Sequence, residues 1–126
     1  MKLTGNEEKI MHILWDSKKP LSSREISQIS PSLKKTVVQT VLRKLSEKKF
    51  VKAVGITYSG SSITREFRPI VTEEEYFASL IPQDILNRVV STFISSENDE
   101  EDIENLYKII KDKYNSLHDL KEGKDV

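Results

Sequence analysis

The order of local patterns in the N-terminal half of this sequence limits what the chain can fold into, because short amphipathic segments come first and β-branched runs follow. The first segment begins with Thr4 and Glu7, and the second with Ser22 and Glu25. Each pair is a capping box, in which two side chains satisfy backbone amides at the start of a helix. Apolar residues then recur at the spacing of a buried helix face. The pattern predicts two short helices, the second ending near Pro31.

A third helix is expected from Leu33 to Lys48, with Ser32 as its N-cap, and its residues separate into two faces. The buried face carries Val37, Val38, Val41, Leu42 and Leu45. The other face carries Lys35, Thr36, Gln39, Thr40 and Arg43. Gln pairs with adenine, Arg with guanine, and Thr offers a methyl group to thymine, so this face suits a helix in the DNA major groove. An ordinary solvated helix face is the equal alternative on this evidence alone.

Residues 50–56 and 63–68 are two β-branched runs, and the Ser- and Gly-containing stretch between them predicts a hairpin with a flexible tip. The second run alternates apolar with polar residues, so one side can pack on the helices. Three helices followed by a hairpin predict a mainly α fold with a small β-hairpin, the winged helix-turn-helix. The wing residues Lys52, Arg65 and Arg68 are then expected to contact DNA phosphates.

The charges are divided unevenly along the chain, although they cancel overall. Residues 1–70 hold 14 Lys and Arg against 6 Asp and Glu, whereas residues 71–126 hold 6 against 14. Clustered Lys and Arg provide affinity for phosphates. The division therefore favours a DNA-binding domain over residues 1–71 and a different role for residues 72–126. Two solvated faces of one globule are the alternative.

Residues 72–126 predict three further helices, which begin near Thr72, after Pro82 and near Asp99, and a short frayed end from Lys121. Three amphipathic helices of this length bury little surface alone, so this region is expected to dimerise. Packing onto the first domain is the alternative. The expected dimer-interface residues are Tyr76, Leu80, Val89, Val90, Phe93, Ile103, Leu106, Tyr107, Ile110 and Tyr114.

Several classes of function lack the residues that they need. The chain has no cysteine, and His12 and His118 lie far apart, so no disulfide, metal site or cofactor is expected. No paired carboxylates, nucleophile motif or phosphate loop points to an enzyme. No apolar run approaches the roughly 20 residues of a membrane span, and no signal peptide is recognisable. We expect a cytoplasmic protein that is not an enzyme.

Four motifs occur in a characteristic order and spacing. They are Glu7-x-x-Ile10-Met11-x-Ile13-Leu14-Trp15, Pro20-Leu21-x-x-Arg24-Glu25-Ile26, Val38-x-Thr40-x-Leu42-x-x-Leu45-x-x-Lys48-x-Phe50 and Phe67-x-Pro69. Together they resemble the penicillinase-repressor (BlaI/MecI/CopY) family, and the resemblance covers most of the chain. It implies a homodimeric repressor on an inverted-repeat operator in double-stranded DNA, with the third helix in the major groove and the helical tails swapped around each other.

The resemblance and the polar helix face together assign roles on DNA. Base contacts are expected from Thr36, Gln39, Thr40 and Arg43. Phosphate contacts are expected from Lys34, Lys35, Lys44, Lys52, Arg65 and Arg68. The chain departs from the family at two positions of this helix. Many members have Trp-Ser where this chain has Leu33-Lys34. They have Arg-Leu where it has Lys44-Leu45, which keeps the positive charge but not the bidentate geometry of arginine. The wing also lacks the common Gly-Arg.

The resemblance bears on the inducing signal as well. Copper-responsive members carry a cysteine-rich C-terminal motif, which is missing here. The β-lactam-responsive members are released from DNA by cleavage next to a Phe that aligns with Phe93, preceded here by Thr92 rather than the more usual Asn. A regulatory protease that cuts at Thr92–Phe93 is therefore an open hypothesis.

Two other functions are compatible with the same fold. A winged helix that binds proteins would be expected to present aromatic anchors on its third helix, where this chain has Lys35, Gln39 and Arg43. A ligand-sensing MarR-like regulator would need a longer chain and an apolar pocket between its domains. A DNA-binding repressor fits the residues best.

Overall fold

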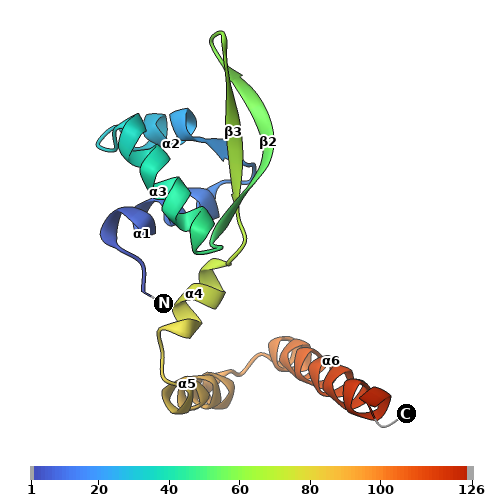
Figure 1. Cartoon of the computed structure of the whole chain (residues 1–126). Helices are drawn as coiled ribbons and strands as arrows, with labels where there is room; N and C mark the ends of the chain where they lie inside the picture. The colour runs from blue at the N-terminus through green and yellow to red at the C-terminus, as the bar shows by residue number, and fades with distance from the viewer. Residues whose placement is uncertain (1, 125–126) are drawn as a thin grey trace. The chain divides into compact units, whose positions relative to one another are not determined.

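A computed structural model describes residues 2–124. The chain forms two compact units, with the boundary in the sequence between Ile81 and Pro82. The N-terminal unit contains α1 (Gly5–Asp16), β1 (Leu21–Ser22), α2 (Ser23–Ile29), α3 (Lys35–Glu47), β2 (Val51–Ser59), β3 (Ser62–Pro69) and α4 (Glu73–Ser79) (Figure 1). The C-terminal unit contains α5 (Gln83–Ser96) and α6 (Glu100–Lys124). The winged-helix order of three helices and a hairpin is confirmed. However, α4, which the sequence assigned to the tail, groups with the N-terminal unit.

Three helices begin with capping boxes, each at a helix start that the sequence predicts. At α1 the amide of Thr4 donates to the Glu7 carboxylate over 2.8 Å, and the amide of Glu7 donates to the Thr4 hydroxyl over 3.4 Å. The same reciprocal arrangement starts α2 and α4, through Ser22 with Glu25 and Thr72 with Glu75. Because each box satisfies two backbone donors, these helix starts are fixed by local sequence.

The start of α3 differs from the prediction. It begins at Lys35 rather than Leu33, and its N-cap is Lys34 rather than Ser32, without a capping side chain. Leu33 is buried in the core, and its carbonyl accepts a hydrogen bond from the Ser27 hydroxyl over 2.7 Å. The core therefore keeps Leu33 in the turn between α2 and α3, and the first amides of α3 have no side-chain cap.

The hydrophobic core joins α1, α2 and α3 to the sheet and to α4. Most apolar positions predicted from helix periodicity are buried, whereas Trp15 and Val37 are only partly buried and Ile29 is exposed. The buried set includes Ile10, Met11, Leu14, Ile26, Val38, Val41, Leu42 and Leu45. One core, with contributions from four helices, therefore holds the N-terminal unit together.

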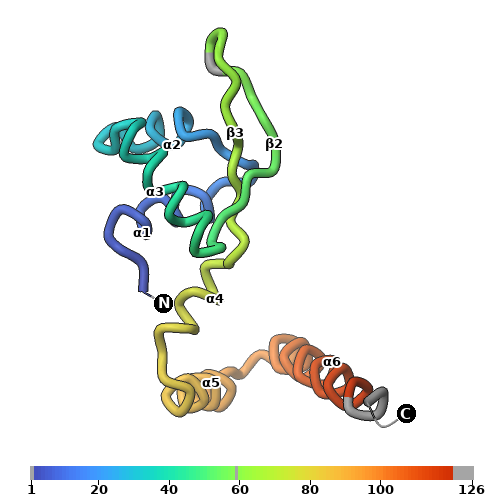
Figure 2. The backbone as a smooth tube through the Cα atoms, in the orientation of Figure 1, coloured from blue at the N-terminus to red at the C-terminus, as the bar shows by residue number. Residues whose placement is uncertain are grey.

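Tyr76 of α4 belongs to this core, which corrects its expected place at a dimer interface. Its side chain is 1% exposed, and its hydroxyl accepts a hydrogen bond from the Leu3 amide over 3.1 Å. Figure 2 shows the N-terminal segment beside α4. The Trp15 indole also donates to the carbonyl of Val71, over 2.8 Å. These contacts fasten α4 to α1 and explain why α4 groups with the N-terminal unit.

A buried ion pair fastens α1 to the end of α3. The Lys48 ammonium donates to both oxygens of the Glu7 carboxylate, over 2.9 and 2.8 Å, and Glu7 is 1% exposed. Burial alone would raise the pKa of Glu7, but the hydrogen bonds from Lys48 and Thr4 outweigh burial and lower this pKa below its ordinary value. The carboxylate thus stays charged inside the fold.

The chain leaves α3 through a Schellman motif. The Phe50 amide donates to the Leu45 carbonyl over 2.9 Å, and the Lys49 amide donates to the Ser46 carbonyl over 3.0 Å. Lys49 has a φ of 64°, the left-handed conformation that favours glycine. The turn therefore carries backbone strain that a glycine would relieve.

The sheet has three antiparallel strands in the order β1-β3-β2. The sequence predicted only the two hairpin strands and not the two-residue strand β1. Both hairpin strands are longer than predicted, since β2 reaches Ser59 and β3 begins at Ser62. The expected flexible tip is a two-residue turn in which Gly60 has a φ of 64°. A register shift between Ala53 and Gly55 interrupts the β2–β3 ladder. In Figure 1 the hairpin projects beyond the helices that it adjoins.

Over 82–120, where burial is described, the C-terminal unit has no buried side chain and so no core of its own. No residue of α5 is buried, and the apolar side chains of α6 are exposed or only half-buried. The helix α6 extends to Lys124, and 125–126 lie outside the described residues. The expected frayed end from Lys121 stays a prediction. In the part of the chain that the structure describes, no helix is long and apolar enough to cross a membrane.

Candidate nucleic-acid interface

The exposed face of α3 carries the four residues predicted to contact bases. Thr36, Gln39, Thr40 and Arg43 are all exposed. Gln39 and Arg43 lie four residues apart, one helical turn, and so point to the same side. The Thr40 hydroxyl donates to the Thr36 carbonyl over 3.0 Å, which leaves the oxygen lone pairs and the methyl group of Thr40 for other contacts. This face can therefore offer amide, guanidinium and methyl groups to base edges.

A hollow of about 400 Å³ lies between α3 and the hairpin, and we call it the α3–wing hollow. Gln39 and Arg43 line it from α3, and Arg65 lines it from β3. The other lining residues are Ser23, Leu42, Ser46, Ile63, Thr64 and Phe67, so none of the lining side chains is acidic. The structure thus brings two predicted base contacts and one predicted phosphate contact into one concave surface.

The β register determines which wing residues face this hollow. Phe67 is packed against the core and lies opposite Ala53. Alternation along β3 places Arg65 and Ile63 on the same face as Phe67, whereas Arg68 lies on the other face. Lys52 is the direct cross-strand partner of Arg68 and shares that other face. The three predicted wing cations are therefore divided between two faces of the hairpin.

The predicted phosphate contacts on α3 flank the base-contact face. Lys34 and Lys35 lie at the helix start, where backbone amides without a side-chain cap favour an anion, and Lys44 lies one residue beyond Arg43. All three are exposed. Among the residues that the structure describes, none of these lysines has an ion-pair partner. Their charges are available to an external anion.

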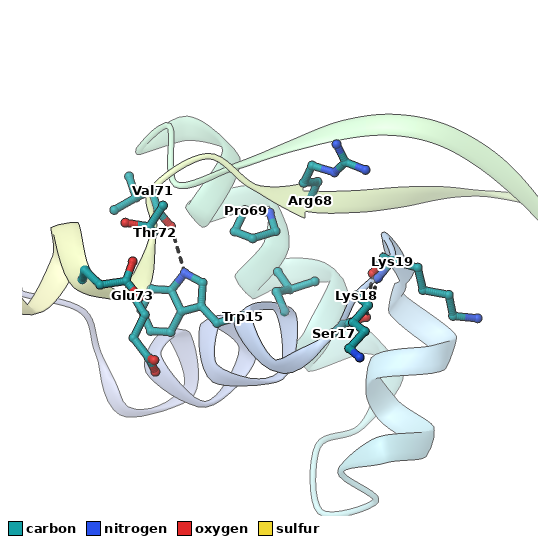
Figure 3. Close-up of a pocket in the computed structure, with 11 residues that line it drawn as sticks. Trp15, Ser17, Lys18, Lys19, Arg68, Pro69, Val71, Thr72 and Glu73 are labelled. Carbon is teal, nitrogen blue, oxygen red and sulfur yellow. Dashed lines mark hydrogen bonds between the residues drawn. The ribbon is translucent and has the colours of Figure 1, made fainter. Parts of the chain in front are cut away.

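Arg68 lines a second hollow, of about 360 Å³, which Figure 3 draws. Trp15, Lys18 and Lys19 line it together with Glu73 and other residues. Lys18 and Lys19 lie in the loop after α1 and were not among the predicted phosphate contacts. Lys19 is also paired with Glu25 over 3.4 Å. Since Glu73 and Glu74 also line it, this second hollow carries charges of both signs, unlike the α3–wing hollow.

The residues expected at a dimer interface in the C-terminal unit lie on unpartnered helix faces. Val89, Val90 and Phe93 of α5 are exposed, as are Tyr107, Ile110 and Tyr114 of α6. Ile103 and Leu106 are half-buried, and Leu80, at the end of α4, is exposed. Thr92 and Phe93 are exposed within the helical turns of α5. A protease would have to unwind this part of α5 locally before it could cut there.

Comparison with solved structures gives matches of low sequence identity, three of which are transcription regulators. PadR of Bacillus subtilis in complex with operator DNA is 17% identical, with a TM-score of 0.49, and the match covers 97% of this chain and 78% of PadR. A MarR/EmrR family regulator from Acinetobacter sp. ADP1 is 22% identical, with a TM-score of 0.45 and coverages of 93% and 78%. MepR of S. aureus bound to DNA is 16% identical, with a TM-score of 0.45 and coverages of 91% and 80%.

Sequence comparison is more specific than these structural similarities. No curated protein sequence gives a significant match. The sequence profile of a family described as Penicillinase repressor, however, matches residues 3–112. This match includes the winged helix, all of α5 and about half of α6, so it is not limited to the DNA-binding fold. The chain belongs to the penicillinase repressor family.

Proposed function

We propose that this DNA-binding repressor acts as a homodimer on an inverted-repeat operator, with one α3 helix in each of two major-groove half-sites. The observation that carries the proposal is the α3–wing hollow, where Gln39, Arg43 and Arg65 meet without an acidic neighbour. A cationic concave surface beside an exposed polar helix suits a duplex, because phosphates provide affinity and base edges provide specificity.

Two groups of side chains have separate roles in this proposal. Thr36, Gln39, Thr40 and Arg43 contact base edges. Lys34, Lys35, Lys44, Lys52, Arg65 and Arg68 contact phosphates. Lys52 lies directly opposite Arg68, and the two cations outnumber the one acidic residue on that face of β3, Glu66, which supports the second role.

Single substitutions test this division of roles. Gln39→Ala and Arg43→Ala should each weaken the free energy of binding to an operator selected from genomic fragments by about 1 to 3 kcal/mol, with little effect on binding to random DNA. Lys35→Ala should weaken binding to the operator and to random DNA alike, and it should lower the slope of log affinity against log salt concentration by about one unit. Lys9→Ala, an exposed lysine on α1, is the matched control. Equal losses on operator and random DNA for the Gln39 and Arg43 variants would contradict the base-reading role.

A homodimer is supported by the C-terminal unit and by the size of one recognition helix. One helix contacts too few base pairs for useful specificity, and two-fold symmetry matches an inverted repeat. The unpartnered apolar faces of α5 and α6 provide the surface for a second copy. The dimer would therefore be formed by the same helices that lack a core in the single chain.

We further propose that a regulatory protease releases the repressor by cutting at Thr92–Phe93. Two linked DNA-binding units gain affinity because the second one binds at a high effective concentration, an advantage of about 10²- to 10⁴-fold that is lost with the linkage. Cleavage there would remove α6 and leave the N-terminal unit whole. A chain that ends at Thr92 should therefore bind the operator far more weakly than the full chain. Binding within about threefold of the full chain would make this switch untenable.

A further inference from the structure

The wing carries a row of exposed apolar side chains that neither the core nor the proposed DNA contacts account for. Ile56 and Ile63 are each 62% exposed, and Tyr58 is 72% exposed. A periodic hydrophobic strand normally buries one face, so the sequence predicted that this side would pack on the helices. Only the base of the hairpin does so, through Phe67.

The register places these side chains together. Tyr58 lies directly opposite Ile63, and Ile56 lies directly opposite Arg65. Residues directly opposite in an antiparallel pair point to the same face, so Ile56, Tyr58 and Ile63 share one face of the hairpin with Arg65. Ile63 and Arg65 also line the α3–wing hollow. The apolar row is therefore continuous with the surface that we assign to DNA.

We propose that Ile56, Tyr58 and Ile63 pack against the deoxyribose rings of the DNA strand whose phosphate Arg65 binds. The inference rests on the proposed function and adds a contact that is not electrostatic. A DNA backbone alternates an anionic phosphate with a sugar ring whose carbon atoms are apolar. A wing face on which apolar side chains lie next to one cation matches that alternation. The strand concerned runs through the α3–wing hollow, beside the helix in the major groove.

Charge favours DNA over a protein as the occupant of this face. Arg43 and Arg65 line the same hollow, no acidic side chain lines it, and neither arginine has an ion-pair partner among the described residues. A protein partner with an ordinary mixed surface would leave one or both guanidinium groups desolvated and unpaired, which is costly. A polyanion pairs with both while its sugars cover the apolar row.

The test uses the full chain with the double substitution Ile56→Thr and Ile63→Thr, which keeps β-branched side chains and strand propensity while it removes apolar surface. Affinity should fall roughly 5- to 10-fold on both the selected operator and random DNA, because sugars are alike in every sequence. The slope of log affinity against log salt should not change, since no charge is removed. Arg65→Gln should instead lower that slope by about 0.9.

Ile70→Thr is the matched control, because Ile70 is exposed but follows β3 outside the hairpin. The DNA affinity of this variant should equal that of the wild type. Unfolding midpoints within about 2 °C of each other establish that the double variant is folded. Unchanged DNA affinity in the folded double variant would overturn the inference and leave the wing face to a protein partner. A loss confined to the operator would also overturn it, since base contacts would then be responsible. Wild-type protein without salt-dependent DNA binding would instead contradict the proposed function itself.

Discussion

The N-terminal and C-terminal units differ in where their apolar side chains lie. In the N-terminal unit, side chains from four helices and the sheet form one buried core, and capping boxes start three of its helices. In the C-terminal unit, no residue of α5 is fully buried, and α6 exposes Tyr107, Ile110 and Tyr114. Both units have amphipathic helices. The helical pattern alone therefore does not distinguish a helix that packs into the core of its own chain from one that packs against a second chain.

This difference indicates that the two units are stabilised by different means. Burial of apolar surface is the dominant favourable contribution to folding, and the N-terminal unit achieves it within one chain. The C-terminal unit can achieve it only with another surface. The stability of the N-terminal unit should therefore be independent of protein concentration, whereas that of the C-terminal unit should depend on it.

The largest expected effect comes from charging the α6 surface. Leu106→Asp with Ile110→Asp should give a monomer that keeps the N-terminal fold but binds its operator about 10²- to 10⁴-fold more weakly, because the linkage between two DNA-binding units is lost. Sedimentation and operator titration measure the two effects. Asn105→Asp with Asn115→Asp adds the same charge to the same helix outside the apolar stripe and should stay dimeric. Sedimentation of the wild type as a monomer at micromolar concentration would contradict the claim that the apolar face of α6 holds two chains together.

A substitution at Tyr76 tests whether α4 belongs to the N-terminal unit. Tyr76→Ala should cost about 3 to 5 kcal/mol of unfolding free energy, because it leaves a large cavity in the core. Tyr76→Phe should cost about 1 to 3 kcal/mol, because the buried Leu3 amide loses its acceptor. Trp15 is the only tryptophan, so its fluorescence reports this unit alone. Leu80→Ala, at the exposed end of α4, should leave the Trp15 transition almost unchanged.

The ion pair between Glu7 and Lys48 gives the N-terminal unit a pH dependence. Since the pKa of Glu7 is lowered in the fold, its contribution is present above its ordinary pKa of 4.5 and is lost as the pH falls through the lowered value. Glu7→Gln should cost about 2 kcal/mol at pH 7, and this difference from the wild type should shrink at pH 3. Glu47→Gln, at an exposed position, should show no such change. A difference that stays constant with pH would mean that Glu7 does not stabilise the fold through its charge.

The smallest effect concerns the turn after α3. Lys49→Gly should stabilise the N-terminal unit by about 1 kcal/mol, because glycine adopts a φ of 64° without the clash that a Cβ causes. Lys44→Gly, inside α3, should destabilise by about the same amount. Trp15 fluorescence in urea measures both. A destabilised Lys49→Gly variant would show that the Lys49 side chain makes a contact that offsets the strain.

Local patterns predicted most of the N-terminal unit, and long-range contacts explain the exceptions. Capping boxes and helix periodicity located α1, α2 and α4, because these signals lie within one or two turns. Leu33 was assigned to α3 because its burial in the α2–α3 turn depends on the assembled core. Tyr76 was assigned to the tail for the same reason, since its partner Leu3 lies at the other end of the unit. The short strand β1 exists only through its pairing with β3.

The candidate site was predictable in its helix and less so in its wing. Gln39 and Arg43 follow directly from the helical period of α3. Alternation along the sequence already separates Arg65 from Arg68, whereas the placement of Ile56 and Tyr58 on the Arg65 face depends on the shift between Ala53 and Gly55. A shift of one residue moves a side chain to the opposite face, and the sequence did not reveal this shift.

The position of β3 in the sheet has a mechanical consequence. β3 is the central strand, and the chain passes directly from its end at Pro69 towards α4. A pull on the C-terminal side of the chain would therefore load the hydrogen bonds of two ladders in shear, rather than peel an edge strand away one bond at a time. The hydrogen bonds from Trp15 to Val71 and from Ile70 to Phe50, at 2.8 and 2.7 Å, reinforce the same attachment point. The wing should thus keep its shape under tension from a tethered tail, and the tail should yield first.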